Sequence, residues 1–122
     1  MVQPLALILN ERIVVGAQLE QKLEALDYRV EVCNEPARFP ALAAELKPLV
    51  IFADIAKDSV LEVLTTLSEQ PETRHVPVVG YAPDVRPDFQ RCANSAGVST
   101  VVPDSAVLQH LKPILDQVLH ID

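Results

Sequence analysis

The chain has 122 residues, of which 49% are apolar and only 4% aromatic, and its formal net charge at pH 7 is −7. This length and composition suit a single domain, residues 1–122, with one aliphatic core, and the acidic balance disfavours nucleic acid and anionic membranes as partners. No apolar run is long enough to span a bilayer and no secretory signal pattern is present, so we expect a cytoplasmic protein.

Strand-like and helix-like patterns alternate through the first half of the chain. A continuous aliphatic run at residues 5–9 predicts a strand that is covered on both faces. Apolar positions recur at helical spacing over residues 13–26 and predict an amphipathic helix. Polar and apolar residues alternate over 28–33, which predicts a strand at the edge of the sheet, and a short helix is expected over 40–46.

The second half continues the alternation. A second uninterrupted apolar run at residues 49–53 predicts a central strand that ends at Asp54. The elements predicted after it are a helix at 58–69, a strand at 76–82, a helix at 88–96 and a strand at 98–102. Five strands alternating with five helices predict an α/β fold, a doubly wound parallel sheet with helices on both faces.

The last helix carries a proline inside an otherwise regular apolar pattern. We expect Asp104 or Ser105 to cap this helix, which runs to about His120. Pro113 lacks an N–H and its ring clashes with the preceding turn, so it is expected to kink the helix.

Chemistry in such a sheet is expected beyond the carboxyl ends of the strands, where ligands of this fold class bind. Asn10 and Glu11 follow the first strand, and Asp54 ends the third. The residues at the ends of the fourth and fifth strands are Tyr81, Ala82, Pro83, Pro103 and Asp104. We therefore expect two carboxylates, Glu11 and Asp54, to face one another across neighbouring strands.

Other kinds of site have little support in the sequence. Cys33 and Cys92 are far apart, and the three histidines are isolated from them and from one another, so no zinc-type spacing is present. The three glycines form no phosphate-binding loop.

Across nearly its whole length the chain resembles the receiver domain of response regulators, the CheY-like family of two-component signalling. The segment KPLVIFADI around Asp54 resembles the third-strand run of that family, and SAGVSTVV resembles its approach to the fifth strand. The resemblance implies a flavodoxin-like sheet with strand order 2-1-3-4-5. It also implies that Asn10 and Glu11 occupy the place of an acidic pair that binds Mg²⁺, and that Asp54 occupies the place of the aspartate that accepts a phosphoryl group from a histidine kinase.

Two positions depart from the family pattern. Ala82, followed by Pro83, stands where the family has Thr or Ser, and Pro103 or Asp104 stands where it has Lys, depending on a one-residue gap. A phospho-aspartate carries about two negative charges and needs charge-assisted donors as well as a metal to hold it. The departures therefore predict a degenerate phosphorylation switch.

Metal binding is expected to be weak or absent. Asn10 offers a neutral oxygen where a hard cation such as Mg²⁺ favours a carboxylate. Glu11 and Asp54 would remain as ligands, with water completing the coordination. Lys57 could serve as a substitute cation near Asp54, although a lysine at a helix start is more often a solvated surface charge.

These observations favour a receiver-like interaction module that is not an enzyme and whose partners are a histidine kinase or a downstream effector. The first alternative is a working phospho-acceptor, with Asp54 as nucleophile and Glu11 as a Mg²⁺ ligand. The second is a flavodoxin-like ligand binder or small enzyme, because the same fold hosts many functions.

A surface for self-association is also expected at the last strand and helix. Val101 and Val102 lie on an edge strand beside a helix rich in Leu, so a homodimer could bury them there. The alternative is that both residues simply fill the core.

Overall fold

A five-stranded parallel sheet forms the middle layer of the molecule. The computed structural model describes residues 5–9, 13–55, 58–71, 73, 76–82, 91, 98 and 100–119. The strands are β1 (Leu5–Leu9), β2 (Arg29–Cys33), β3 (Val50–Asp54), β4 (Val78–Ala82) and β5 (Thr100–Pro103). Their order is β2-β1-β3-β4-β5 and every neighbouring pair is parallel, which confirms the predicted doubly wound sheet and its 2-1-3-4-5 order.

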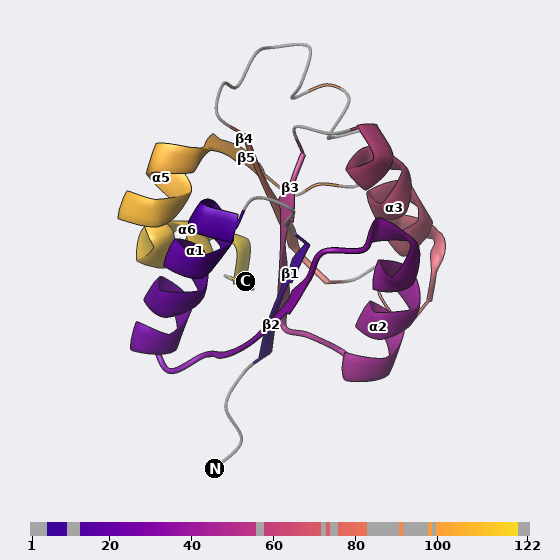
Figure 1. Ribbon diagram of the computed structural model, residues 1–122, viewed down its shortest axis with the longest axis horizontal. Coiled ribbons are helices and arrows are strands. Elements are labelled where there is room, and N and C mark those ends of the chain that lie inside the picture. The colour runs from indigo at the N-terminus through magenta and orange to yellow at the C-terminus, as the bar shows by residue number, and fades with distance from the viewer. Residues whose placement is uncertain are drawn as a thin grey trace.

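Helices cover both faces of this sheet. They are α1 (Ile13–Ala25), the 3₁₀ helix η1 (Pro36–Arg38), α2 (Phe39–Leu46), α3 (Asp58–Glu69), α5 (Asp104–Gln109) and α6 (Leu111–Leu119). Figure 1 shows α1, α5 and α6 on one side of the sheet and α2 and α3 on the other. The predicted helix at 88–96 lies outside the described residues except for Arg91, which is helical.

Because helices cover both faces of the sheet, the inner strands consist of continuous runs of apolar residues. Successive side chains of a strand point to opposite faces. Leu7 of β1 accordingly packs into the core on the α2 and α3 side, and Ile8 packs into the core on the α1, α5 and α6 side. All five residues of β3 and of β4 are buried, so both strands are central.

β2 is an edge strand, as its alternating pattern predicts. The turn before it ends α1 with Asp27 in the left-handed region (φ 66°), while Tyr28 N–H donates to the Leu23 carbonyl at 3.0 Å. This is a Schellman-type ending, which satisfies carbonyls of the last turn of α1. Asp27 therefore holds a conformation that more often belongs to glycine, and it fixes the direction in which β2 leaves α1.

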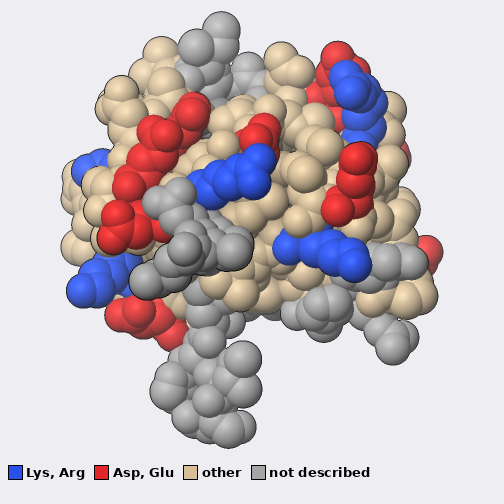
Figure 2. Space-filling model, turned by 90° about the horizontal axis from the view of Figure 1, so that it is seen from below, with Lys and Arg blue, Asp and Glu red and all other residues tan. Residues whose placement is uncertain are grey.

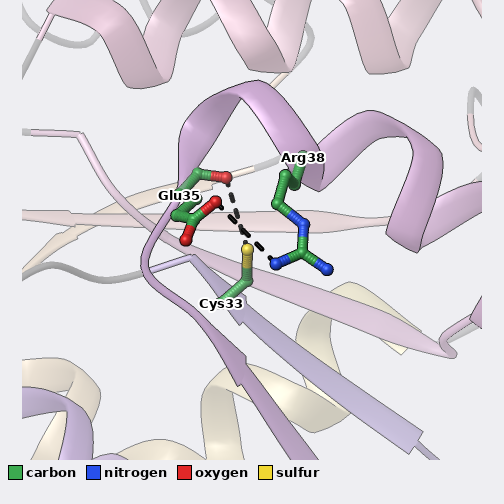
Figure 3. Close-up of polar contacts among 3 residues, drawn as sticks. All are labelled: Cys33, Glu35 and Arg38. Atoms are coloured by element: carbon green, nitrogen blue, oxygen red, sulfur yellow. Dashed lines mark hydrogen bonds and ion pairs between the residues drawn. The ribbon is translucent and has the colours of Figure 1, made fainter.

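The turn after β2 is held by its own side chains. The Cys33 thiol donates to the Glu35 carbonyl at 3.3 Å, and the Arg38 guanidinium lies 3.8 Å from the Glu35 carboxylate. Figure 3 shows the three residues where the chain leaves β2 and enters η1 and α2. Cys33 is a free, buried thiol.

The observed β4 begins two residues later than predicted. Pro77 has no N–H to donate to a neighbouring strand, so the regular ladder starts at Val78. The Pro77 carbonyl still accepts a hydrogen bond from Ile51 N–H at 3.0 Å, which aligns the entry to β4 with β3.

The last helix differs from the prediction of one kinked helix that passes through Pro113. The chain forms two helices, α5 and α6, separated at His110, whose φ of −122° and ψ of 37° are not helical. The break comes three residues before Pro113 and places this proline in the first turn of α6. There its missing N–H would have had no partner within the helix, so the break removes the conflict that a continuous helix would contain.

Val101 and Val102 of β5 are half-buried. Val101 packs against the core on the α2 and α3 side, and Val102 packs against the core on the α1, α5 and α6 side. These contacts favour the expectation that both residues fill the core, and self-association through β5 and the last helix remains a prediction without structural support.

Gly80 allows the chain beyond β3 to fold closely over β4. A Cβ atom placed on Gly80 would lie 3.0 Å from Cγ2 of Ile55 and 3.3 Å from Cγ1 of Val98. Ile55 directly follows Asp54, so the absence of a side chain at Gly80 helps to set where β3 ends.

We predict that Gly80→Val lowers the free energy of unfolding by about 1–3 kcal/mol, because extra methyl groups in a filled core force side chains and backbone to shift. Urea denaturation of the wild type and the variant measures the loss. Ala41→Val, at an exposed position of α2, is the control and should cost at most about 0.7 kcal/mol through helix propensity. Equal losses in the two variants would contradict the close packing at Gly80.

Candidate functional site

The carboxyl ends of β3, β4 and β5 meet at one edge of the sheet. Asp54, the last residue of β3, lies opposite Tyr81 in the register between β3 and β4. One step further along, Ala82 of β4 lies opposite Pro103, the last residue of β5. The sequence predicts that these ends gather, and the structure places Asp54, Ala82 and Pro103 on three consecutive strands.

Asp54 is a buried acid at the end of a central strand. Only 2% of its surface is exposed, whereas most acidic residues lie on the surface of a protein. The adjacent backbone is fixed, because Ile55 N–H donates to the Tyr81 carbonyl at 3.0 Å. A carboxylate held in this way could act as a nucleophile towards a phosphoryl group or as a ligand for a hard cation.

The two neighbouring strand ends offer no side-chain hydrogen-bond donor. Ala82 is fully buried and carries only a methyl group, and Pro103 carries an aliphatic ring. Pro103 ends β5, and Asp104 follows as the first residue of α5.

Asp104 does not cap α5, contrary to the sequence prediction. The N-cap residue is Pro103, which makes no side-chain capping hydrogen bond. Asp104 instead lies in the first helical turn, where the partial positive charge of the helix N-terminus favours an acid. The fully helical conformation of Asp104 and Ser105 rules out the extended backbone that a capping residue adopts.

Asn10, Glu11, Lys57 and Pro83 lie outside the described residues, so their expected places in the site remain predictions. The described part of β1 ends at Leu9, which lies opposite Ala53, one residue before Asp54. Within the part of the chain that the structure describes, no three residues of the types His, Cys, Asp and Glu group closely enough to hold a metal ion. In the described part of the site, Asp54 is the buried acid at the end of β3, and Asp104 is a second acid at the start of α5.

A shallow cavity of about 170 Å³ lies at the end of β2, and sequence reasoning did not find it. Its lining consists of Val32, Cys33, Asn34, Glu35, Arg38 and Leu42. The Arg38 guanidinium and the Cys33 thiol in this lining both contact Glu35 (Figure 3). No sequence motif signals this cavity, because it results from the path of the turn between β2 and α2.

Charged side chains of both signs are interspersed on one face of the molecule (Figure 2). On the face in Figure 2, the described Lys and Arg residues lie apart from one another, with acidic side chains among them. They form no continuous basic surface on this face, which is what binding to a phosphate backbone would use. Among the described residues, no helix is both long enough and apolar enough to cross a membrane.

Comparisons with known proteins find similarity in structure rather than in sequence. No family model matches the chain, and no curated protein matches it significantly. A response regulator from Hahella chejuensis aligns with a TM-score of 0.84 and 20% identity over 98% of this chain and 97% of its own. Chemotaxis protein CheY4 from Vibrio cholerae aligns with a TM-score of 0.88 and 17% identity over 97% of this chain and 100% of its own.

The receiver domain of a sensor histidine kinase from Pseudomonas aeruginosa aligns with a TM-score of 0.87 and 16% identity, over 98% of this chain and 100% of its own. In that structure a magnesium ion is coordinated in the active-site cleft. The three alignments cover 97–98% of this chain, which includes its whole sheet and the helices around it. The chain therefore has the fold of the CheY-like receiver domains of response regulators.

Proposed function

We propose that this chain is a receiver-like domain of two-component signalling with a degenerate phosphorylation switch, and that it acts as a non-catalytic protein-interaction module. One observation carries the proposal. Ala82 and Pro103 lie opposite each other at the ends of β4 and β5, and β4 pairs with β3, which ends at Asp54. The resemblance maps the family's hydroxyl to Ala82 and its lysine to Pro103 or Asp104. Neither the Ala82 nor the Pro103 side chain can donate a hydrogen bond to a phosphoryl group on Asp54.

The physical consequence concerns how a modification changes a protein. A phosphoryl group shifts a conformational equilibrium only when it interacts differently with the two conformations. With Ala82 and Pro103 at the strand ends, the side chains that would respond to the added charge are missing. Asp104, the next residue, is an acid and would repel that charge.

The partners follow from this interpretation. A histidine kinase or a downstream effector would bind a single conformation of the domain, which does not depend on phosphorylation. Recognition would then depend on the surface of the fold and not on the state of Asp54. No residue of the chain is assigned a catalytic role, and we expect the protein and its partners to meet in the cytoplasm.

The second candidate is a working phospho-acceptor, which the burial of Asp54 at the end of the central strand favours. In that case Asp54, Glu11 and Asn10 would hold Mg²⁺. When bound, the ion would neutralise charge on the transferred phosphoryl group. Asp54 fits this role, and the contribution of the other two residues is the part of the candidate that metal titration tests.

We predict that a small-molecule phosphodonor with Mg²⁺ adds no phosphoryl mass to this protein, because the side chains that would stabilise a phospho-aspartate are absent. Intact-mass spectrometry after incubation with acetyl phosphate measures the addition. Asp54→Asn is the matched control, since it keeps the shape of the side chain and removes the nucleophile. A mass gain in the wild type that Asp54→Asn abolishes would establish the second candidate instead.

Metal affinity gives an independent prediction. We expect Mg²⁺ titration, followed by calorimetry, to require millimolar metal or to show no binding, because Asn10 supplies no charge. Asn10→Asp should tighten binding if this side chain shares a pocket with Asp54, and the double variant with Asp54→Asn should lose the gain. Sub-micromolar binding by the wild type would contradict a degenerate site.

A further inference from the structure

β2 presents an open edge of the sheet. It is the first strand in the order β2-β1-β3-β4-β5 and pairs only with β1 among the described residues. In Figure 1 it lies between α1 and α2, which cover the two faces of the sheet beside it. Three of its five residues are exposed, and one of them is the apolar Val32, of which 44% is accessible.

The two faces of this edge carry different chemistry. Arg29 and Glu31 point to the side of α2, where their side chains are 65% and 47% exposed and lie 3.8 Å apart. Val30 and Val32 point to the other side, and Tyr28 shares that side because it is two residues before Val30. Tyr28 and Val30 both pack partly against the core beneath α1.

We propose that β2 pairs with β2 of a second copy of this chain, antiparallel and centred on Val30, so that the two sheets join into one. Directly opposite residues of an antiparallel pair point to the same face. Arg29 then lies opposite Glu31 of the second copy, and Glu31 lies opposite its Arg29. On the other face, Val30 meets its own copy and Val32 meets Tyr28 of the second copy.

The charges select this register over its neighbours. A two-fold axis normal to the sheet keeps each face of one sheet continuous with the same face of the other. The axis must therefore pass midway between one residue of β2 and the same residue of the second copy. Centring the pair on Arg29 or on Glu31 would place like charges directly opposite, which destabilises a strand pair. Centring on Val30 makes both charged pairs opposite in sign and all facing pairs on the second face apolar or aromatic.

Charged residues on an edge strand often prevent pairing with another chain. Such residues prevent pairing by repulsion when the residues that lie opposite each other in the two copies have charges of the same sign. Arg29 and Glu31 carry opposite signs and are spaced symmetrically about Val30, so they favour the twofold pair. The net charge of −7 per chain opposes association through longer-range repulsion, and we expect the dimer to be clearest at physiological ionic strength, where that repulsion is screened.

Sedimentation equilibrium from micromolar to millimolar protein tests the proposal. The wild type should dimerise, and Arg29→Glu and Glu31→Arg should each weaken the dimer at least about tenfold by placing like charges opposite. The double variant Arg29→Glu with Glu31→Arg should restore it, because the pairs are complementary again. Mixing the two single variants should give a heterodimer, since one then presents two acids and the other two arginines.

Two controls separate edge pairing from the effect of overall charge. Glu62→Arg on α3 and Lys112→Glu on α6 are exposed positions with the same changes in net charge, and they should leave the dimer intact. Circular dichroism checks that every variant is folded. A wild type that stays monomeric at millimolar concentration would overturn the proposal, and so would a dimer that the single variants leave unchanged or that the double variant fails to restore.

Discussion

Parallel pairing is the constraint on which the rest of this structure depends. Because all five strands run in one direction, every strand delivers the residue at its carboxyl end to the same edge of the sheet. Parallel strands also need cover on both faces, which the helices on either side provide. Asp54 is at this edge because β3 is parallel to its neighbours, and it is buried because β3 is covered on both faces.

The same register determines which groups surround Asp54. Pairing of β3 with β4 and of β4 with β5 places Ala82 beside Pro103 at the neighbouring strand ends. The fold of CheY-like receivers is therefore combined here with two strand-end side chains, Ala82 and Pro103, that cannot donate a hydrogen bond. Fold and switch are separate properties, because the apolar runs specify the sheet whereas a few residues at its edge specify the chemistry.

Much of the sheet could be predicted from the sequence, because continuous apolar runs and alternating patterns distinguish its inner strands from β2. The break at His110 could not be predicted, because a proline within a helical pattern indicates a kink or a break but not the residue at which the helix is interrupted. The boundary between β5 and α5, which falls between Pro103 and Asp104, also needed the structure. The edge position of β2 was predicted from its alternating pattern, but the contact between Arg29 and Glu31 and their exposure needed the structure.

The most direct test of the central claim is whether a phosphoryl-like group at Asp54 changes the structure at the ends of β4 and β5. Backbone amide chemical shifts measured by NMR, with and without beryllofluoride and Mg²⁺, report this residue by residue. The degenerate interpretation predicts no change, or changes confined to the immediate neighbours of Asp54. Changes that extend through Val101, Val102 and α5 would show that the switch responds and would contradict the account.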